Sequence, residues 1–112
     1  MEITHTYQDA VTVVVVTGSV DALTAPQLGG SLTQQIGTGR INLVLDLARL
    51  DYTSSAGLRA ILGAVKEARQ RGGDLRLAGV QPNVSKVFEM SGFTNILKFY
   101  ADADAAAQSF SA

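Results

Sequence analysis

The sequence predicts an α/β fold, with a mixed β-sheet of four to five strands covered by about four α-helices. Two observations support this prediction. Short β-branched or apolar runs alternate with segments whose apolar residues recur every three and four positions, the spacing of a helix face. The first two extended runs are separated by a connection short enough for a hairpin, whereas the later runs are separated by helical segments. Strands joined through helices favour parallel pairing, so the hairpin makes the sheet mixed.

The N-terminal part of the chain contains the expected hairpin and a first helix. Strands are expected over Ile3–Gln8, which alternates weakly between apolar and polar residues, and over Val11–Thr17, which is a run of β-branched residues. A helix follows from Thr24, which forms a capping-box pattern with Gln27. Its apolar stripe consists of Ala25, Leu28, Leu32 and Ile36. A glycine pair at 29–30 within this helix indicates either close packing or a shortened helix.

A strand and an amphipathic helix make up the centre of the chain. The strand is expected over Ile41–Leu47. The helix has an apolar stripe at i, i+3, i+4 and i+7, and Gly72 and Gly73 end it. The stripe consists of Leu58, Ile61, Leu62 and Val65.

The C-terminal part repeats the alternation. A strand is expected over Asp74–Gly79, a short helix over Pro82–Met90, a last extended piece ending at Phe99, and a closing helix in the alanine-rich end. The predicted order is therefore β-β-α-β-α-β-α-β-α.

Length and composition favour a single domain over residues 1–112. The chain has no cysteine, which excludes disulfides, thiolate metal sites and thiol catalysis. The net charge is −1, with basic residues scattered among acids, which argues against nucleic-acid binding. The longest apolar run, around Val13–Val16, is too short to span a membrane, and the N-terminus does not look like a signal peptide. We expect a cytoplasmic protein.

No set of residues in the sequence matches an enzyme active site. A serine hydrolase would need His5, the only histidine, as its base, and the segment TSSAG departs from the G-x-S-x-G pattern. A phospho-accepting role for Asp46 would need an acidic pair after the first strand, where only Asp21 is found; Asp9 is misplaced. The sequence also lacks the glycine-rich motifs that hold nucleotide phosphates. We therefore expect no enzymatic activity, metal or cofactor.

The segment LDYTSSAGLRAI, residues 50–61, places two serines where the central helix begins. One serine is explained as the N-cap, whose side chain accepts a hydrogen bond from a free backbone N–H. The second would face solvent in the first turn. A phosphoryl group there would lie beside the positive end of the helix dipole, so the domain could carry this modification and remain folded.

The sequence resembles a stand-alone STAS domain of the anti-sigma factor antagonist family over nearly its whole length. The resemblance is carried by GSVDALTAPQL (18–28), INLVLDLARLDYTSSAGLRAIL (41–62) and GGDLRLAGVQPNVSKVFEMSGF (72–93). It implies the STAS fold and a non-catalytic regulator that binds a serine-protein kinase of the histidine-kinase-like ATPase type, which often doubles as an anti-sigma factor. Phosphorylation of one serine would release this partner, and a PP2C-type phosphatase would restore binding.

The resemblance assigns the site by alignment on Gly57 and the leucine after it. Ser55 then matches the phospho-acceptor, with Ser54 as the alternative. Ser54 stands where the family usually has an acid, and Ala56 stands at the second hydroxyl position of the family motif. Asp21 matches an acidic position on a loop near the phosphosite, although turn formation alone also explains it. The expected partner-binding residues are Asp21, Thr53, Ser54, Ala56, Gly57 and Arg59.

Two further function classes remain open at this point. STAS domains also occur as phosphorylation-independent binding subunits of lipid or anion transport systems at membranes, and a small α/β enzyme is the weakest alternative. For oligomeric state, we expect a monomer.

Overall fold

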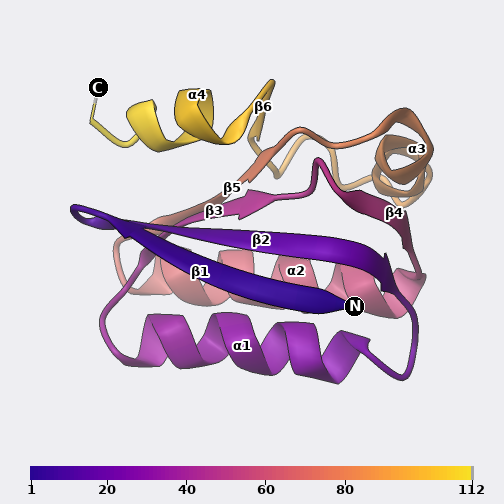
Figure 1. Ribbon diagram of the computed structural model, residues 1–112, viewed down its shortest axis with the longest axis horizontal. Coiled ribbons are helices and arrows are strands. Elements are labelled where there is room, and N and C mark those ends of the chain that lie inside the picture. Colours follow the sequence, from indigo (N-terminus) through magenta and orange to yellow (C-terminus); the bar gives the residue numbers. More distant parts are fainter. Residues whose placement is uncertain (112) are drawn as a thin grey trace.

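The computed structural model describes residues 1–111, which form six strands and four helices (Figure 1). In chain order these are β1 (Glu2–Gln8), β2 (Val11–Val20), α1 (Ala25–Gly37), β3 (Asn42–Asp46), β4 (Leu50–Thr53), α2 (Ser55–Gln70), β5 (Asp74–Ala78), α3 (Pro82–Met90), β6 (Phe99–Tyr100) and α4 (Ala103–Gln108).

The sheet is mixed, as predicted, with the order β1-β2-β3-β5-β6. β1 and β2 form the antiparallel hairpin, and the other pairs are parallel. β4 lies off this path and pairs in parallel with the end of β2, after a register shift between Gly18 and Ser19. No strand was expected over the residues of β4, so the sheet within residues 1–111 has one strand more than the upper expected number.

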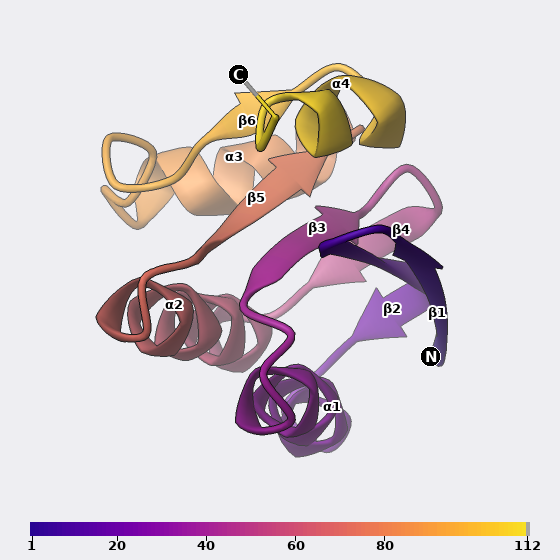
Figure 2. The same ribbon diagram turned by 90° about the vertical axis from the view of Figure 1, so that its left-hand side faces the viewer.

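The helices cover both faces of the sheet. Figure 2 shows α1 and α2 side by side on one face and α4 on the other. The larger core lies between the sheet and α1, α2 and α3, and the smaller core lies under α4. In β3, Leu43 and Leu45 face the larger core, whereas Val44 faces the smaller one. The central strands are therefore buried on both faces, which explains their continuous apolar sequences.

The apolar stripe of α1 is buried as predicted. The capping-box prediction is wrong, because Thr24 makes no side-chain cap to the helix. Its hydroxyl instead accepts a hydrogen bond from the backbone N–H of Asp21 and donates one to the Asp21 carboxylate, both at 3.0 Å. The glycine pair at 29–30 is explained neither by close packing nor by a shortened helix. A Cβ at Gly29 would lie at an ordinary contact distance of 3.5 Å from the Ala60 Cβ of α2, a Cβ at Gly30 would meet nothing within 4 Å, and α1 runs on to Gly37.

The first turn of α2 lies directly on the ends of β2 and β4. Gly57, in this turn, is buried, and a Cβ there would collide with the hydroxyl of Thr53 and lie 2.8 Å from Cγ1 of Val20. Contacts this short require a neighbouring atom to move. Glycine is therefore needed here for close approach, and it sets how near the start of α2 comes to the sheet.

Asp74, at the start of β5, is a buried carboxylate that faces three basic side chains. Its oxygens lie 2.8 Å from Arg69 Nε, 3.1 Å from Arg76 Nε and 3.7 Å from Lys98 Nζ. Burial raises the pKa of Asp74, but hydrogen bonds from Arg69 and Arg76 outweigh this effect and hold the pKa below its ordinary value. The cluster ties the last turn of α2 to β5.

The packing at Gly57 leads to a stability prediction. Gly57→Ala should lower the free energy of unfolding by roughly 1–3 kcal/mol, because overpacking outweighs the better helix propensity of alanine. Gly63→Ala is the matched control in the same helix, where an added Cβ meets nothing within 4 Å. It should stabilise the protein by up to about 1 kcal/mol. Urea denaturation measures both, and equal effects of the two substitutions would contradict the packing argument.

The charge cluster at Asp74 leads to a prediction about pH. Asp74→Asn should lower the free energy of unfolding by roughly 3 kcal/mol at pH 7, because it leaves a partly buried arginine without its counter-ion. The folded pKa is depressed, so this stability is present above the unfolded pKa of about 3.9 and is lost as the pH falls through the lower folded value. The difference in free energy of unfolding between wild type and variant, measured by urea denaturation, should therefore become smaller below about pH 4.

The control for this experiment is Glu89→Gln, at an exposed position of α3. It should leave stability nearly unchanged at pH 7. If the difference in free energy of unfolding between Asp74→Asn and wild type stays constant down to about pH 2, the carboxylate charge is not responsible for the stability difference.

Candidate functional site

Two neighbouring strand ends bring the candidate residues together. Val20 of β2 is paired in register with Thr53 of β4, and the backbone N–H of Ser54 donates a 2.8 Å hydrogen bond to the carbonyl of Val20. The loop that follows β2 begins at Asp21, and α2 begins after Ser54. Parallel pairing of β2 and β4 therefore puts the Asp21 loop beside the two serines.

Ser54 is the N-cap of α2. Its backbone is extended, and its hydroxyl accepts a 3.2 Å hydrogen bond from the backbone N–H of Gly57. The side chain is half-buried against the strand ends. The sequence predicted that one of the two serines caps the helix, and the structure gives this role to Ser54, whose hydroxyl is occupied by the contact.

Ser55 is the first residue of α2 and has a different environment. It is exposed, and its hydroxyl forms no hydrogen bond with any of residues 1–111. The first turn of α2 also contains no acidic residue. Of the two serines, Ser55 is therefore the one whose hydroxyl is accessible and unengaged.

Asp21 organises the loop between β2 and α1. One carboxylate oxygen accepts hydrogen bonds from the N–H groups of Leu23 and Thr24, at 3.0 and 2.9 Å, and from the Thr24 hydroxyl. Hydrogen bonds from the backbone and then the side chain of Thr24 lower the pKa of Asp21. The turn-forming role is thus present in the structure. Asp21 and Leu23 are both exposed, so the same loop also offers a surface beside Ser54.

The other expected partner-binding residues differ in exposure. Arg59 is exposed and Ala56 is half-buried, whereas Thr53 and Gly57 are buried. The Thr53 hydroxyl donates a hydrogen bond to the carbonyl of Ser54. Thr53 and Gly57 therefore support the site from beneath and are not available for side-chain contact.

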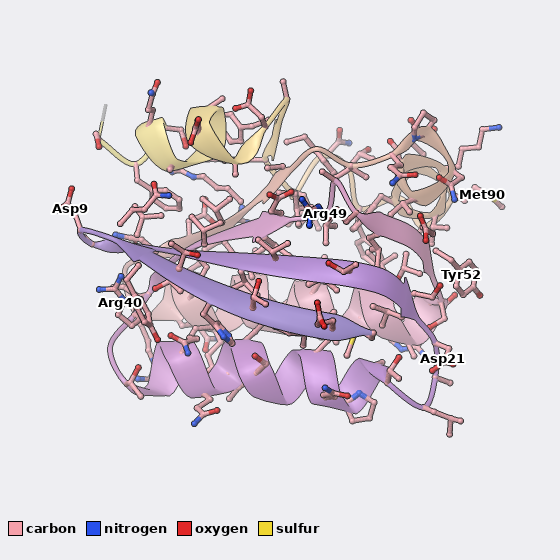
Figure 3. The ribbon with its side chains drawn as sticks, viewed as in Figure 1. Asp9, Asp21, Arg40, Arg49, Tyr52 and Met90 are labelled. Atoms are coloured by element: carbon pink, nitrogen blue, oxygen red, sulfur yellow. The ribbon has the colours of Figure 1, made fainter. Side chains whose placement is uncertain are left out.

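A groove of about 390 Å³ opens beside the serines, between α3 and the β4–α2 junction. Its lining residues are Tyr52, Thr53, Ser54, Ser55, Val87, Met90 and Ser91. Tyr52 is 51% exposed and Met90 is 87% exposed, so both present large apolar surfaces to solvent. Figure 3 shows Asp21, Tyr52 and Met90 at one end of the molecule, opposite Asp9 and Arg40.

Sequence reasoning did not identify Tyr52 or Met90. Strand alternation would not have identified Tyr52, because it places Tyr52 on the same face as Leu50, and Leu50 is buried whereas Tyr52 is exposed. Met90 carries no signal either, because the last residue of an amphipathic helix can face either way.

The residues considered for catalysis have other contacts. His5 lies on β1, and its Nε2 is 3.1 Å from the hydroxyl of Ser31 on α1. Asp46 accepts a hydrogen bond from the N–H of Ala48, as a turn carboxylate does. Neither side chain is hydrogen-bonded to Ser54 or Ser55.

Comparison with known proteins finds relatives that match nearly the whole chain, including the candidate site. The STAS domain family model matches residues 2–106. BtrV of Bordetella bronchiseptica, a candidate anti-sigma factor antagonist, is 41% identical over 110 residues, which cover 98% of this chain and 95% of that protein. The anti-sigma-B factor antagonist of Listeria monocytogenes is 37% identical over 84 residues, which cover 74% of this chain and 73% of that protein.

Solved structures share the fold. SpoIIAA, an anti-sigma factor antagonist of Bacillus, has been solved without and with phosphorylation. The two forms match this chain with TM-scores of 0.76 and 0.75, at 19% and 20% identity. Each match covers 96% of this chain, and the SpoIIAA chains are covered to 96% and 99%. The family-model match and the sequence relatives agree with this likeness, and the chain belongs to the STAS domain family.

Proposed function

We propose that this chain is an anti-sigma factor antagonist that works by partner switching, with Ser55 as the phosphorylated residue. The observation that carries the proposal is the exposed, unengaged hydroxyl of Ser55 at the start of α2, in a chain whose relatives are named anti-sigma factor antagonists. One structural relative has been solved in both phosphorylated and unphosphorylated forms, which supports a switch of this kind.

In this proposal the partner is a serine-protein kinase of the histidine-kinase-like ATPase type that is also an anti-sigma factor. The Ser55 oxygen attacks the γ-phosphorus of ATP, the bond from that phosphorus to ADP breaks, and the serine proton passes to a base on the kinase. A PP2C-type phosphatase resets the switch by hydrolysis: water attacks the phosphorus, inorganic phosphate leaves and the serine recovers its proton.

The proposed docking surface surrounds Ser55. The Asp21 loop lies on one side and the groove edged by Tyr52 and Met90 on the other, and Arg59 extends the surface along α2. Exposed aromatic residues and methionine beside polar groups are typical of interface cores. Thr53 and Gly57 shape this surface from within, through the close approach of α2 to the strands.

Phosphorylation changes the charge of this surface and leaves its fold in place. A phosphoserine adds about −1.5 to −2 charges beside a helix N-terminus, where the helix dipole favours an anion. The same charge at the centre of a packed interface brings desolvation and repulsion. A penalty of roughly 2–3 kcal/mol would weaken binding by about thirty- to more than a hundredfold, enough to exchange partners.

The proposal also covers the state of the chain. In it, the chain acts as a non-catalytic monomer in the cytoplasm and uses no cofactor of its own. Within residues 1–111, no helix has both the length and the apolar character needed to span a bilayer.

The division of roles between the serines leads to a stability prediction. Ser54→Ala should lower the free energy of unfolding by about 1 kcal/mol, because it removes the N-cap hydrogen bond to Gly57. Ser55→Ala should change it by less than about 0.5 kcal/mol, because the Ser55 side chain makes no contact of this kind. Thermal and urea unfolding measure both. A larger loss of unfolding free energy from Ser55→Ala than from Ser54→Ala would mean that Ser55, and not Ser54, is the residue that caps the helix.

The proposed function is tested with the same two variants and the cognate kinase. Ser55→Ala should bind the kinase constitutively and take up no phosphate from ATP, whereas Ser54→Ala should still be phosphorylated. Phosphosite mapping by mass spectrometry and binding by calorimetry give the two readouts. Phosphate on Ser55→Ala but not on Ser54→Ala would move the acceptor to Ser54, and phosphate on neither residue in the wild type would refute the switch.

A further inference from the structure

The exposed face of α2 forms a basic ridge that begins at Ser55. The outward-facing residues recur every three or four positions, so they share one side of the helix. They are Ser55, Arg59, Gly63, Lys66 and Gln70. The ridge contains two cations and no acid, and the one acidic residue of α2, Glu67, is half-buried beside it.

Arg59 has no counter-ion within the part of the chain that the structure describes. All three ion pairs among residues 1–111 converge on Asp74, at the other end of α2. The guanidinium of Arg59 is also without a hydrogen bond in those residues, and its side chain is exposed. A fork of N–H donors is therefore free one helical turn after Ser55.

Helix geometry directs Arg59 toward Ser55. Residues four apart lie on the same face, and helical side chains lean toward the N-terminus, so a long side chain at 59 covers position 55. An anion that precedes a cation by four residues is the favourable orientation of such a pair. Guanidinium also binds phosphate through paired hydrogen bonds. The Ser54 hydroxyl is already used as the cap, so it does not compete for the phosphate.

We propose that phosphoserine at position 55 takes Arg59 as its counter-ion within α2, and that this pairing withdraws from the partner a cation that the unmodified ridge presents. Two exposed cations that form no ion pair within residues 1–111 fit an acidic surface, so the anti-sigma factor places a carboxylate opposite Arg59. This inference rests on the proposed phosphorylation of Ser55. The pairing adds a second cause of release. The phosphate repels the partner's carboxylate, and it also engages Arg59, the residue that bound this carboxylate before phosphorylation.

The intrahelical pair is tested without any kinase, on the full chain with phosphoserine installed at position 55 by genetic-code expansion. The readout is the second pKa of the phosphate, followed by ³¹P NMR at low and physiological salt. Arg59→Gln should raise this pKa by about 0.3, because the lost cation stabilised the dianion. Arg59→Lys should retain most of the effect, and added salt should weaken it.

Lys66→Gln is the matched control on the same ridge. Lys66 lies eleven residues beyond Ser55, roughly 16 Å along the helix axis, which exceeds the screening length of about 8 Å at physiological salt. Its substitution should leave the phosphate titration unchanged. If the phosphate has the same second pKa in the wild type and in Arg59→Gln, the proposed ion pair does not form.

Binding to the anti-sigma factor tests the regulatory half of the inference, namely that the pairing withdraws Arg59 from the partner. Unmodified Arg59→Gln should bind roughly three- to tenfold more weakly than the wild type. Phosphoserine at position 55 should weaken binding by a smaller factor in Arg59→Gln than in the wild type, because there is no longer a counter-ion to withdraw. An equal factor in both would overturn this inference and leave the proposed function intact. No weakening in the wild type would refute the proposed function together with the regulatory half, whatever the titration shows.

Discussion

The close approach of α2 to the ends of β2 and β4 is the contact on which the rest of the site depends. It is possible because Gly57 has no side chain where Thr53 and Val20 lie against the helix. With the first turn held there, the hydroxyl of Ser54 reaches the Gly57 N–H and caps the helix. Ser55 is then the first residue to emerge into solvent, and the ridge that it begins points away from the core. The difference between two adjacent serines thus follows from a packing constraint beneath them.

A second constraint comes from the sheet. Loops that leave parallel strands at their carboxyl ends gather at one edge, and β2 and β4 are neighbours with Val20 opposite Thr53. The Asp21 loop and the start of α2 consequently share a surface although they lie more than thirty residues apart in sequence. The internal hydrogen bonds of Asp21 and Thr24 give this loop a defined shape, so the surface beside Ser55 is preformed.

Sequence periodicity was enough to predict the helices and the hairpin, and to place the cap of α2 at one of two adjacent serines, because these depend on local spacing. Features that depend on contacts between distant parts of the chain were not predicted. β4 is a four-residue strand whose identity comes from pairing with the end of β2. The capping box at Thr24 failed for a local reason, because Asp21, three residues earlier, takes both hydrogen-bonding functions of the Thr24 hydroxyl. The buried charge of Asp74 is tolerated only because Arg69, Arg76 and Lys98 converge on it from three parts of the chain. The groove residues Tyr52 and Met90 belong with these, since their exposure depends on how α3 packs.

The two ends of α2 are held by different forces, and this has a kinetic consequence. At its C-terminal end Arg69 bonds both to Asp74 and to the carbonyl of Ile96, so charge and hydrogen bonds fix the helix to β5 and to the segment before β6. The N-terminal end is held by the cap and by apolar contact, which an added phosphate does not touch. If the proposed switch operates, a partner exchange centred on Ser55 requires no refolding step within the domain. The speed of that exchange would then be set by how fast the proposed kinase and phosphatase turn over and how fast their complexes dissociate, and so by the partners.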